Sequence, residues 1–226
     1  MGEFAECLDG IKEACNFLNY PVVSGNVSFY NGTNKKNIYP TPVIGGVGLI
    51  KRLSKPLSHN FKKSNSTIIL IGKTFGHIEQ SCFLKENYSI TEGMPPEINL
   101  LNEKNNGESL LKLIDKNLIL SAHDISNGGL ITALSEMTLT SNYGAKIHKP
   151  KKLTNLFRYF FGEDQARYII EIQAQKLPSV EKLLKENNVY YENIGFTQEN
   201  YFEIEGELKI STKDLFKINN QWYKNF

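Results

Sequence analysis

The sequence has few cysteines, and this scarcity excludes several classes of protein. Cys7, Cys15 and Cys82 are the only three in 226 residues. They form an odd number at spacings that match no zinc or disulfide framework. We expect reduced thiols in the core, because two of them fall where a helix face should be buried. A nucleophilic cysteine paired with one of the four histidines is the alternative, and it has no local sequence signature in its favour.

Long apolar runs and an excess of one charge are also missing. No segment approaches the roughly 18–20 apolar residues that a membrane span needs. The first residues lack the charged and apolar regions of a secretory signal. Lysine and arginine total 26 against 24 acidic residues, a net charge of +2, and the lysines are scattered. We therefore expect a cytoplasmic protein that binds neither a membrane nor nucleic acid.

The first 50 residues predict a helix followed by two strands. Apolar residues repeat at three- and four-residue steps from Phe4 to Leu18, which is typical of a helix face, and Pro21 ends the pattern. The segments 21–30 and 41–50 are rich in β-branched residues and predict strands on either side of a polar turn. Such a sequence is typical of a small α+β unit.

The rest of the chain predicts a second domain. A polar segment at 51–66 has the composition of a linker, so we place the domain boundary there. Beyond it, apolar and amphipathic stretches alternate, which predicts an α/β or α+β fold. The predicted strands are 67–72, 118–122, 168–172, 189–196 and 201–211, and the predicted helices include 80–84, 110–114, a helix after 128–129, and 178–186.

The segment 24–28 (Ser-Gly-Asn-Val-Ser) is the first candidate for chemistry. Glycine lets a ligand approach the backbone, while asparagine and serine supply a carbonyl and a hydroxyl oxygen suited to magnesium and phosphate. An ordinary β-bulge is the alternative interpretation. This short segment alone does not decide between them.

A second candidate is the segment 122–129, between a predicted strand and a predicted helix. The start of a helix favours phosphate, and the carboxylate of Asp124 could hold a magnesium ion there. Alternatively, Asp124, Ser126 or Asn127 simply caps the helix. His123 could act as a general base, although a histidine at a strand end is more often a structural hydrogen-bonding group.

A third candidate is the pair Glu163 and Asp164 before a predicted strand. Adjacent carboxylates could bind a divalent ion, with Arg167 to neutralise them, but solvated turn charges are the simpler expectation. The Gly-Lys-Thr triplet at 72–74 lacks the first glycine of a Walker A loop, so it does not predict one.

Taken in order, these segments resemble the synthetase subunit of the phosphoribosylformylglycinamidine synthase family. The similar stretches cover most of the chain and include 13–15, 21–31, 40–49, 71–76, 122–134 and 161–167. The resemblance implies the fold of the superfamily that contains aminoimidazole ribonucleotide synthetase. It makes residues 1–50 the tail of a second ATP-binding-type domain and 51–226 a complete carboxy-terminal domain.

The family's reaction uses ATP and Mg²⁺ to convert formylglycinamide ribonucleotide to its amidine with ammonia from glutamine. By resemblance, the backbone of Gly25 meets ATP, Asn26 binds magnesium, Ser28 contacts substrate, and Asp124 lies at an auxiliary nucleotide or metal site. The resemblance places no catalytic residue within this chain. Two residues depart from the family's pattern: Asn127 replaces a common carboxylate and Glu79 a usual glycine.

The implied partners are an amino-terminal half of the synthetase that this chain lacks, a glutaminase subunit and a small bridging subunit. On this view the chain is a fragment, inactive alone, that completes the enzyme with a separate half. The alternative is an inactive remnant or a non-enzymatic nucleotide-binding module. Another superfamily member, such as a selenophosphate synthetase or a hydrogenase-maturation protein, is less consistent with the segment 24–31.

Overall fold

A computed structural model describes residues 2–34, 36–50, 56–150, 155–221 and 223. The chain divides into two compact units, Met1–Lys55 and Pro56–Phe226. The boundary that we predicted at residue 50 adjoins residues 51–55, which lie outside the described residues. Each unit is described separately below.

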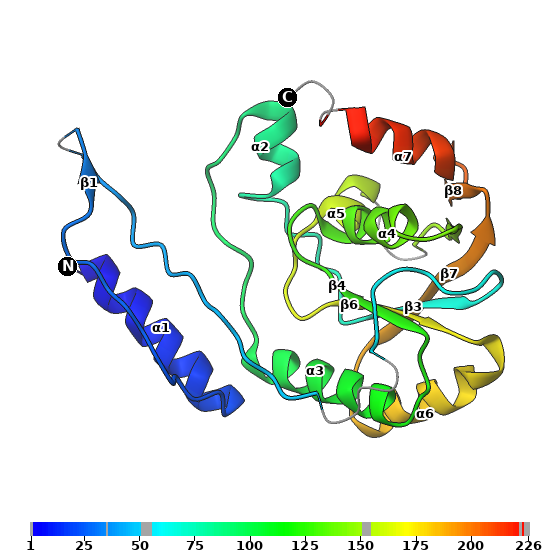
Figure 1. Cartoon of the computed structure of the whole chain (residues 1–226), viewed down its shortest axis with the longest axis horizontal. Coiled ribbons are helices and arrows are strands. Elements are labelled where there is room, and N and C mark those ends of the chain that lie inside the picture. The colour runs from blue at the N-terminus through cyan, green and yellow to red at the C-terminus, as the bar shows by residue number, and fades with distance from the viewer. Residues whose placement is uncertain (1, 35, 51–55, 151–154, 222, 224–226) are drawn as a thin grey trace. The chain divides into compact units, whose positions relative to one another are not determined.

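The first unit contains one long helix and a short hairpin. Helix α1 runs from Gly2 to Leu18, which confirms the helix predicted from the apolar repeat. Strands β1 (Gly32–Thr33) and β2 (Lys36–Asn37) pair antiparallel. The ring centroids of Phe4 and Phe29 lie 5.6 Å apart. The Tyr20 hydroxyl accepts a hydrogen bond from Val47 N at 3.1 Å. The first contact joins α1 to the segment that follows it, and the second joins the two extended segments of the unit, which Figure 1 shows in blue.

The strands predicted at 21–30 and 41–50 are not formed, so that prediction was wrong for this structure. Both segments are extended but carry no sheet pairing among the residues described. Their apolar side chains are exposed: Val23 is 88% and Val43 93% accessible. A strand forms only where its N–H and C=O groups find a partner strand, and β-branched composition alone supplies none.

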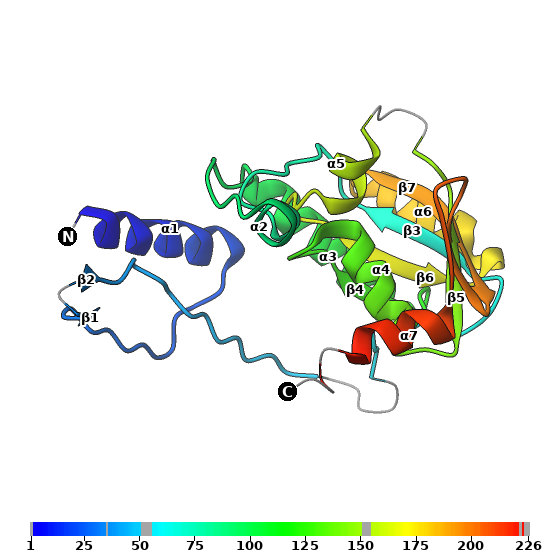
Figure 2. The same cartoon turned by 90° about the horizontal axis from the view of Figure 1, so that it is seen from above.

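The second unit is built on one mixed sheet in the order β4-β6-β3-β7-β5-β8-β9. All neighbours pair antiparallel except β5 and β8, which pair parallel. Figure 2 shows β3, β6 and β7 side by side. The strands are β3 (Thr67–Ile71), β4 (Ser121–Asp124), β5 (Tyr143–Ile147), β6 (Tyr168–Ile172), β7 (Tyr191–Glu199), β8 (Tyr201–Ile204) and β9 (Leu208–Ser211).

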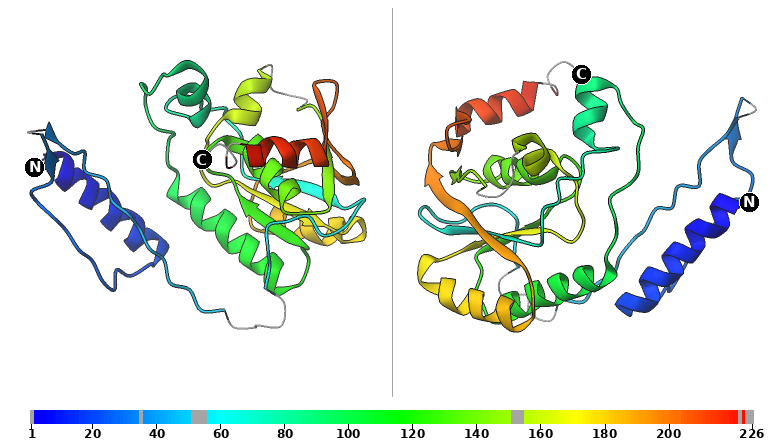
Figure 3. Two further views of the ribbon diagram at one scale, coloured as in Figure 1. Left: turned by 45° about the horizontal axis from the view of Figure 1, so that its top comes forward. Right: turned by 180° about the vertical axis from the view of Figure 1, so that it is seen from behind.

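Helices cover both faces of this sheet, as Figures 1 and 3 show. One core lies under α4, α5 and α7, and a second lies under α3 and α6. The helices are α2 (Cys82–Tyr88), α3 (Leu100–Asp115), α4 (Gly129–Leu139), α5 (Leu156–Phe161), α6 (Leu177–Glu186) and α7 (Thr212–Gln221), with a 3₁₀ turn at Ala174–Lys176. This arrangement confirms the predicted α/β (α+β) class.

The central strands β3 and β6 are rich in isoleucine and leucine because both of their faces are covered. Ile68 to Ile71 on β3 are fully buried, and so are Ile169, Ile170 and Ile172 on β6. The predictions at 67–72, 168–172 and 178–186 are therefore confirmed to within a residue or so. The helix after 128–129 is also confirmed.

Several expectations about the units were wrong or incomplete. The three cysteines are free but only partly buried, and α1 has no buried residue, so Cys7 and Cys15 are not core thiols here. Gln80 and Ser81 precede α2 instead of joining it, because Ser81 is its N-cap and accepts from Leu84 N at 3.3 Å. In the part of the chain that is described, no helix has the length and apolar character to cross a membrane.

Candidate functional site

The segment 162–167 before β6 makes hydrogen bonds to several loops at one end of the sheet. Asp164 is only 5% exposed. Its Oδ2 accepts hydrogen bonds from Phe75 N at 3.0 Å and Gly76 N at 2.9 Å, and its Oδ1 accepts from His77 N at 3.0 Å. Three successive backbone N–H groups thus form a nest for one carboxylate. The expectation of a solvated charge at Asp164 was wrong.

Glu163 holds two other segments. Its Oε1 accepts from Cys82 N at 2.8 Å and from Gly128 N at 2.7 Å, and both donors lie at the starts of helices. Its own N–H donates to His77 O at 2.8 Å. A carboxylate is favoured at a helix start by the N–H groups and the helix dipole. Glu163 therefore already occupies the anion position that we predicted for phosphate at α4.

Arg167 completes the segment from within the core, where it is 1% exposed. Its guanidinium donates to Gly162 O at 2.6 Å, Asp164 O at 3.1 Å and Thr74 Oγ1 at 3.2 Å, and lies 3.9 Å from Asp164 Oδ2. Burial lowers the pKa of Arg167, and the charge of Asp164 opposes that effect. The buried cation is thus paired and satisfied by hydrogen bonds, as its burial requires.

Asp124 ends β4 and begins the turn that leads into α4. Its side chain is 67% exposed, and its Oδ1 lies 3.3 Å from His123 Nδ1. His123 Nε2 lies 3.0 Å from Glu136 Oε2, and the His59 ring packs 5.1 Å from that of His123. His123 is thus bound between two carboxylates, in agreement with the structural role we weighed for it.

The capping interpretation of this turn was wrong. The N-cap of α4 is Gly128, with φ +81°, and it makes no side-chain cap hydrogen bond. Ser126 and Asn127 are exposed in the turn. A side chain at residue 128 would meet Thr132, so glycine is required there for both space and conformation. The backbone is instead held by Glu163, which lies far away in the sequence.

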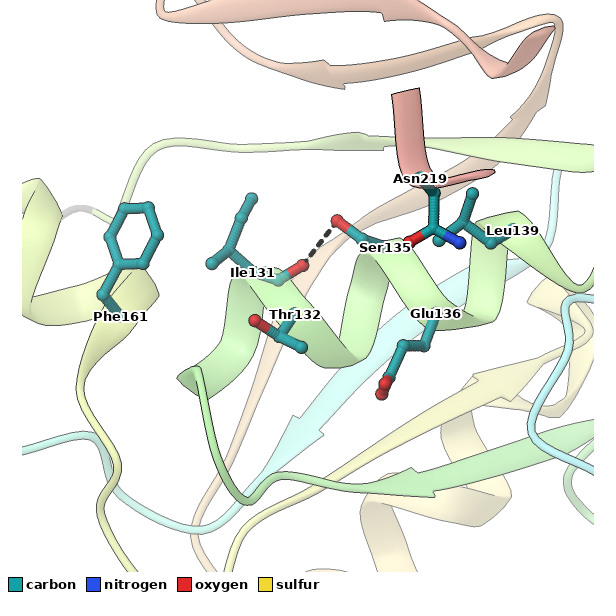
Figure 4. A pocket seen from close by; sticks show the side chains of 7 residues that line it. All are labelled: Ile131, Thr132, Ser135, Glu136, Leu139, Phe161 and Asn219. Carbon is teal, nitrogen blue, oxygen red and sulfur yellow. Dashed lines mark hydrogen bonds between the residues drawn. The ribbon is translucent and has the colours of Figure 1, made fainter. Parts of the chain in front are cut away.

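A groove adjoins this turn along α4. It encloses about 310 Å³ and is lined by α4, Phe161 of α5 and Asn219 of α7. Figure 4 shows Phe161 at one end and Asn219 and Leu139 toward the other, with the Ser135 hydroxyl donating to Ile131 O. Glu136 lines the groove and also contacts His123 on β4, so one residue of α4 links the groove to the end of that strand.

Gly25, Asn26 and Ser28 lie in the first unit, on the extended and exposed segment after α1. Nothing lies within 4 Å of a Cβ placed at Gly25. The Ser28 carbonyl accepts from Asn31 Nδ2 at 3.3 Å. Asp124 belongs to the second unit, so the four predicted site residues are not gathered within either one. Among the side chains described, no three of His, Cys, Asp and Glu are grouped to hold a metal ion.

A buried acceptor that the sequence analysis missed is Glu171 on β6, which is fully buried. It accepts from Lys62 N at 2.8 Å, Lys63 N at 3.1 Å and the Ser121 hydroxyl at 2.9 Å. The only signal in the sequence was a single glutamate inside an apolar strand.

Burial raises the pKa of the Cys82 thiol, and the charge of Glu163 raises it further, which disfavours a reactive thiolate.

Comparison with known proteins decides the family. Residues 63–204 match the family described as AIR synthase related protein, C-terminal domain, and this match covers more than half of the chain. The chain belongs to the AIR synthase related family. Its residues 1–50 match the description AIR synthase related protein, N-terminal domain.

The resemblance to phosphoribosylformylglycinamidine synthase is confirmed by relatives of this AIR synthase related chain. Over all 226 residues it is 49% identical to the synthase subunit PurL of Pelagibacter ubique (strain HTCC1062). It is 39% identical to PurL of Rhodopseudomonas palustris (strain TIE-1). It covers 31% of each of these proteins, so it spans about a third of the length of the curated relatives it matches.

Solved structures confirm the fold of this family member. Thermotoga maritima PurL complexed with FGAR matches with a TM-score of 0.59 at 16% identity, covering 71% of this chain and 29% of that one. The same protein complexed with ATP matches with a TM-score of 0.55 at 15% identity, covering 71% and 27%. The structure of PurLQS from T. maritima gives 0.55 at 17% identity, with the same coverage.

Proposed function

We propose that this chain forms part of a phosphoribosylformylglycinamidine synthase of de novo purine biosynthesis. The observation that carries the proposal is the 49% identity to P. ubique PurL across every residue of the chain. Solved relatives of the same fold are complexed with FGAR and with ATP, which supports these two molecules as substrates. The proposed reaction is an amidine-forming carbon–nitrogen ligation.

In this reaction ATP transfers its γ-phosphoryl group to the oxygen of the substrate's glycinamide carbonyl and leaves as ADP. Ammonia then adds to the same carbon, and phosphate departs with the former amide oxygen, which leaves the amidine. Most of the catalysis in such phosphoryl transfers is positioning and stabilisation of charge. The proposed contribution of this chain is therefore binding, with the reacting groups supplied by the rest of the synthetase.

The proposed contacts in the first unit are Gly25 to ATP, Asn26 to magnesium and Ser28 to substrate. Their segment is extended and exposed, so backbone and side chains are open to a ligand. The Asn26 amide oxygen is a hard ligand of the type that Mg²⁺ accepts. Magnesium usually takes one or two carboxylates as well. Among the described residues, no three side chains of His, Cys, Asp or Glu are grouped so that they could hold a metal ion.

The proposed domain division is 1–50 and 51–226, with the extended segments 21–30 and 41–50 becoming strands against the remainder of the synthetase. Their exposed apolar side chains and unpaired backbone support this pairing. A glutaminase subunit and a small bridging subunit are the further proposed partners, since a PurLQS assembly exists for the T. maritima relative. Such an assembly would work in the cytoplasm.

An inactive remnant, or a module that binds nucleotide without turnover, is the second candidate. One observation favours it: the chain spans about a third of the length of the curated relatives it matches. In either case we propose that the 226-residue chain alone does not complete the reaction. The two candidates differ in what happens when the other two thirds of the synthetase are added.

The test measures ADP release with formylglycinamide ribonucleotide, ATP, Mg²⁺ and ammonium. The chain is assayed alone and mixed with the part of P. ubique PurL that it does not match. Activity only in the mixture, lost with Asn26→Ala and kept with Asn37→Ala, supports the proposal. Asn37 is a matched control because it is an exposed asparagine of the same unit. A folded and associated mixture that releases no ADP would favour the remnant.

A further inference from the structure

The turn between β4 and α4 is held from outside at both ends. Ile125 N donates to Arg167 O at 3.0 Å, and Gly128 N donates to Glu163 Oε1 at 2.7 Å. Between these bonds the turn projects the exposed Ser126 and Asn127, and the exposed Asp124 directly precedes the first bond. The position of these exposed polar groups therefore depends on a segment some 35 residues further along the chain.

Glu163 couples this turn to a second loop. The oxygen that accepts from Gly128 N also accepts from Cys82 N at 2.8 Å, and the backbone N–H of Glu163 donates to His77 O. One carboxylate thus ties together the start of α2, the start of α4 and its own segment. Without it, two helix-terminal N–H groups would lose their acceptor.

We propose that Glu163 is a positioning residue that fixes the turn carrying Asp124 for ligand binding. The inference rests on the proposed function and on the expectation, from the family resemblance, that Asp124 lies at an auxiliary nucleotide or metal site. Ligand contacts are strongest when their donors and acceptors are held in place before binding, because less freedom is then lost. Residues that orient a contact group through a hydrogen bond commonly change affinity by about 10–100-fold when removed.

Three variants of the full chain separate positioning from general stability. Glu163→Ala removes the acceptor, whereas Glu163→Gln keeps one carbonyl oxygen that can take both bonds, since both donors use Oε1. Val180→Ala is the stability control, because Val180 is buried in the core on the opposite face of the sheet. Two quantities are measured: amide hydrogen exchange at Gly128 and Cys82, and affinity for ATP with Mg²⁺ by calorimetric titration.

We expect Glu163→Ala to speed exchange at both amides and to weaken ATP binding by about 10-fold or more. Glu163→Gln should change the affinity by less than about 3-fold, which is below the range expected for removal of the contact. Val180→Ala should leave the affinity unchanged. Unchanged exchange in Glu163→Ala overturns the proposal, and so does faster exchange with unchanged affinity.

ATP binding by the unsubstituted chain distinguishes failure of the Glu163 proposal from failure of the proposed synthase function. If the unsubstituted chain binds no ATP with Mg²⁺, the turn has no such ligand to position and the role of Glu163 is refuted. The proposed synthase function would then stand or fall on ADP release from the mixture with the remaining PurL segment. If the unsubstituted chain binds but the Glu163 variants do not differ, only the positioning role fails.

Discussion

Replacing Asp164 by asparagine should destabilise the second unit more than replacing Glu163 by glutamine, although both changes turn a carboxylate into an amide. The reason lies in which oxygens accept. Asp164 uses both oxygens, Oδ2 for Phe75 and Gly76 and Oδ1 for His77. An asparagine amide has one carbonyl oxygen, so its NH₂ group must face at least one of these N–H donors. Glu163 uses Oε1 alone, and glutamine retains that oxygen.

The magnitude for Asp164→Asn combines three losses. A buried donor left without an acceptor costs about 1–3 kcal/mol, and each remaining bond loses about 1 kcal/mol when its acceptor becomes neutral. Arg167 also loses its buried anionic neighbour at 3.9 Å. We expect about 3–5 kcal/mol in total, the range typical of breaking a buried charge pair. Glu163→Gln weakens two bonds only, which costs about 2 kcal/mol.

Urea unfolding followed by far-ultraviolet circular dichroism measures the difference. With a slope of about 1–3 kcal/mol per molar urea, a gap of about 2 kcal/mol separates the two midpoints by roughly 1 M. Amide exchange gives a local check, because in Asp164→Asn at least one of the Phe75, Gly76 and His77 amides should lose protection. Equal midpoints for the two variants, or a lower midpoint for Glu163→Gln, would refute the reasoning.

Two further predictions concern the core and one tyrosine. Leu134 on α4 is fully buried, so Leu134→Ala should lower the free energy of unfolding by about 2–5 kcal/mol, whereas Leu111→Ala, 61% exposed, should change it by less than about 0.5 kcal/mol in the same urea assay. The Tyr190 hydroxyl donates to Glu192 Oε1 at 2.5 Å, which raises the pKa of Tyr190 to about 12 from an ordinary value of 10. Because the pKa of Tyr190 is raised in the folded state, the stability that this hydrogen bond contributes is present below pH 10 and is lost as the pH rises through 12. A Tyr190→Phe chain should not show this loss of stability, and its pH titration should lack one late step in tyrosinate absorbance. A titration that keeps this step in Tyr190→Phe would contradict the assignment.

The sequence by itself determined the elements whose signal is local. The isoleucine-rich runs of β3 and β6 and the amphipathic pattern of α6 were predicted close to their observed bounds, because burial on a face or stripe requires apolar residues at set spacings. The resemblance to the family was also readable, since it rests on the order of short segments along the chain.

Elements without a strong local signal were not predicted. Strand β5 contains a glycine and a lysine and lies between β7 and β8, and α5 and α7 are short helices. Conversely, the segments 21–30 and 41–50 have strand composition but no strand. In both cases the deciding factor is the presence or absence of neighbouring chain to pair with, which composition does not encode.

The tertiary structure alone decided the roles of two buried carboxylates, Asp164 and Glu171, and of the half-buried Glu163. Asp164, Glu163 and Glu171 look like surface charges in sequence, yet their hydrogen-bond donors lie between 35 and 109 residues away from them. A carboxylate becomes an anchor only when folding removes water and brings unpaired N–H groups to it. Sequence spacing cannot reveal such partners, because the loops that carry them meet only after the sheet has assembled.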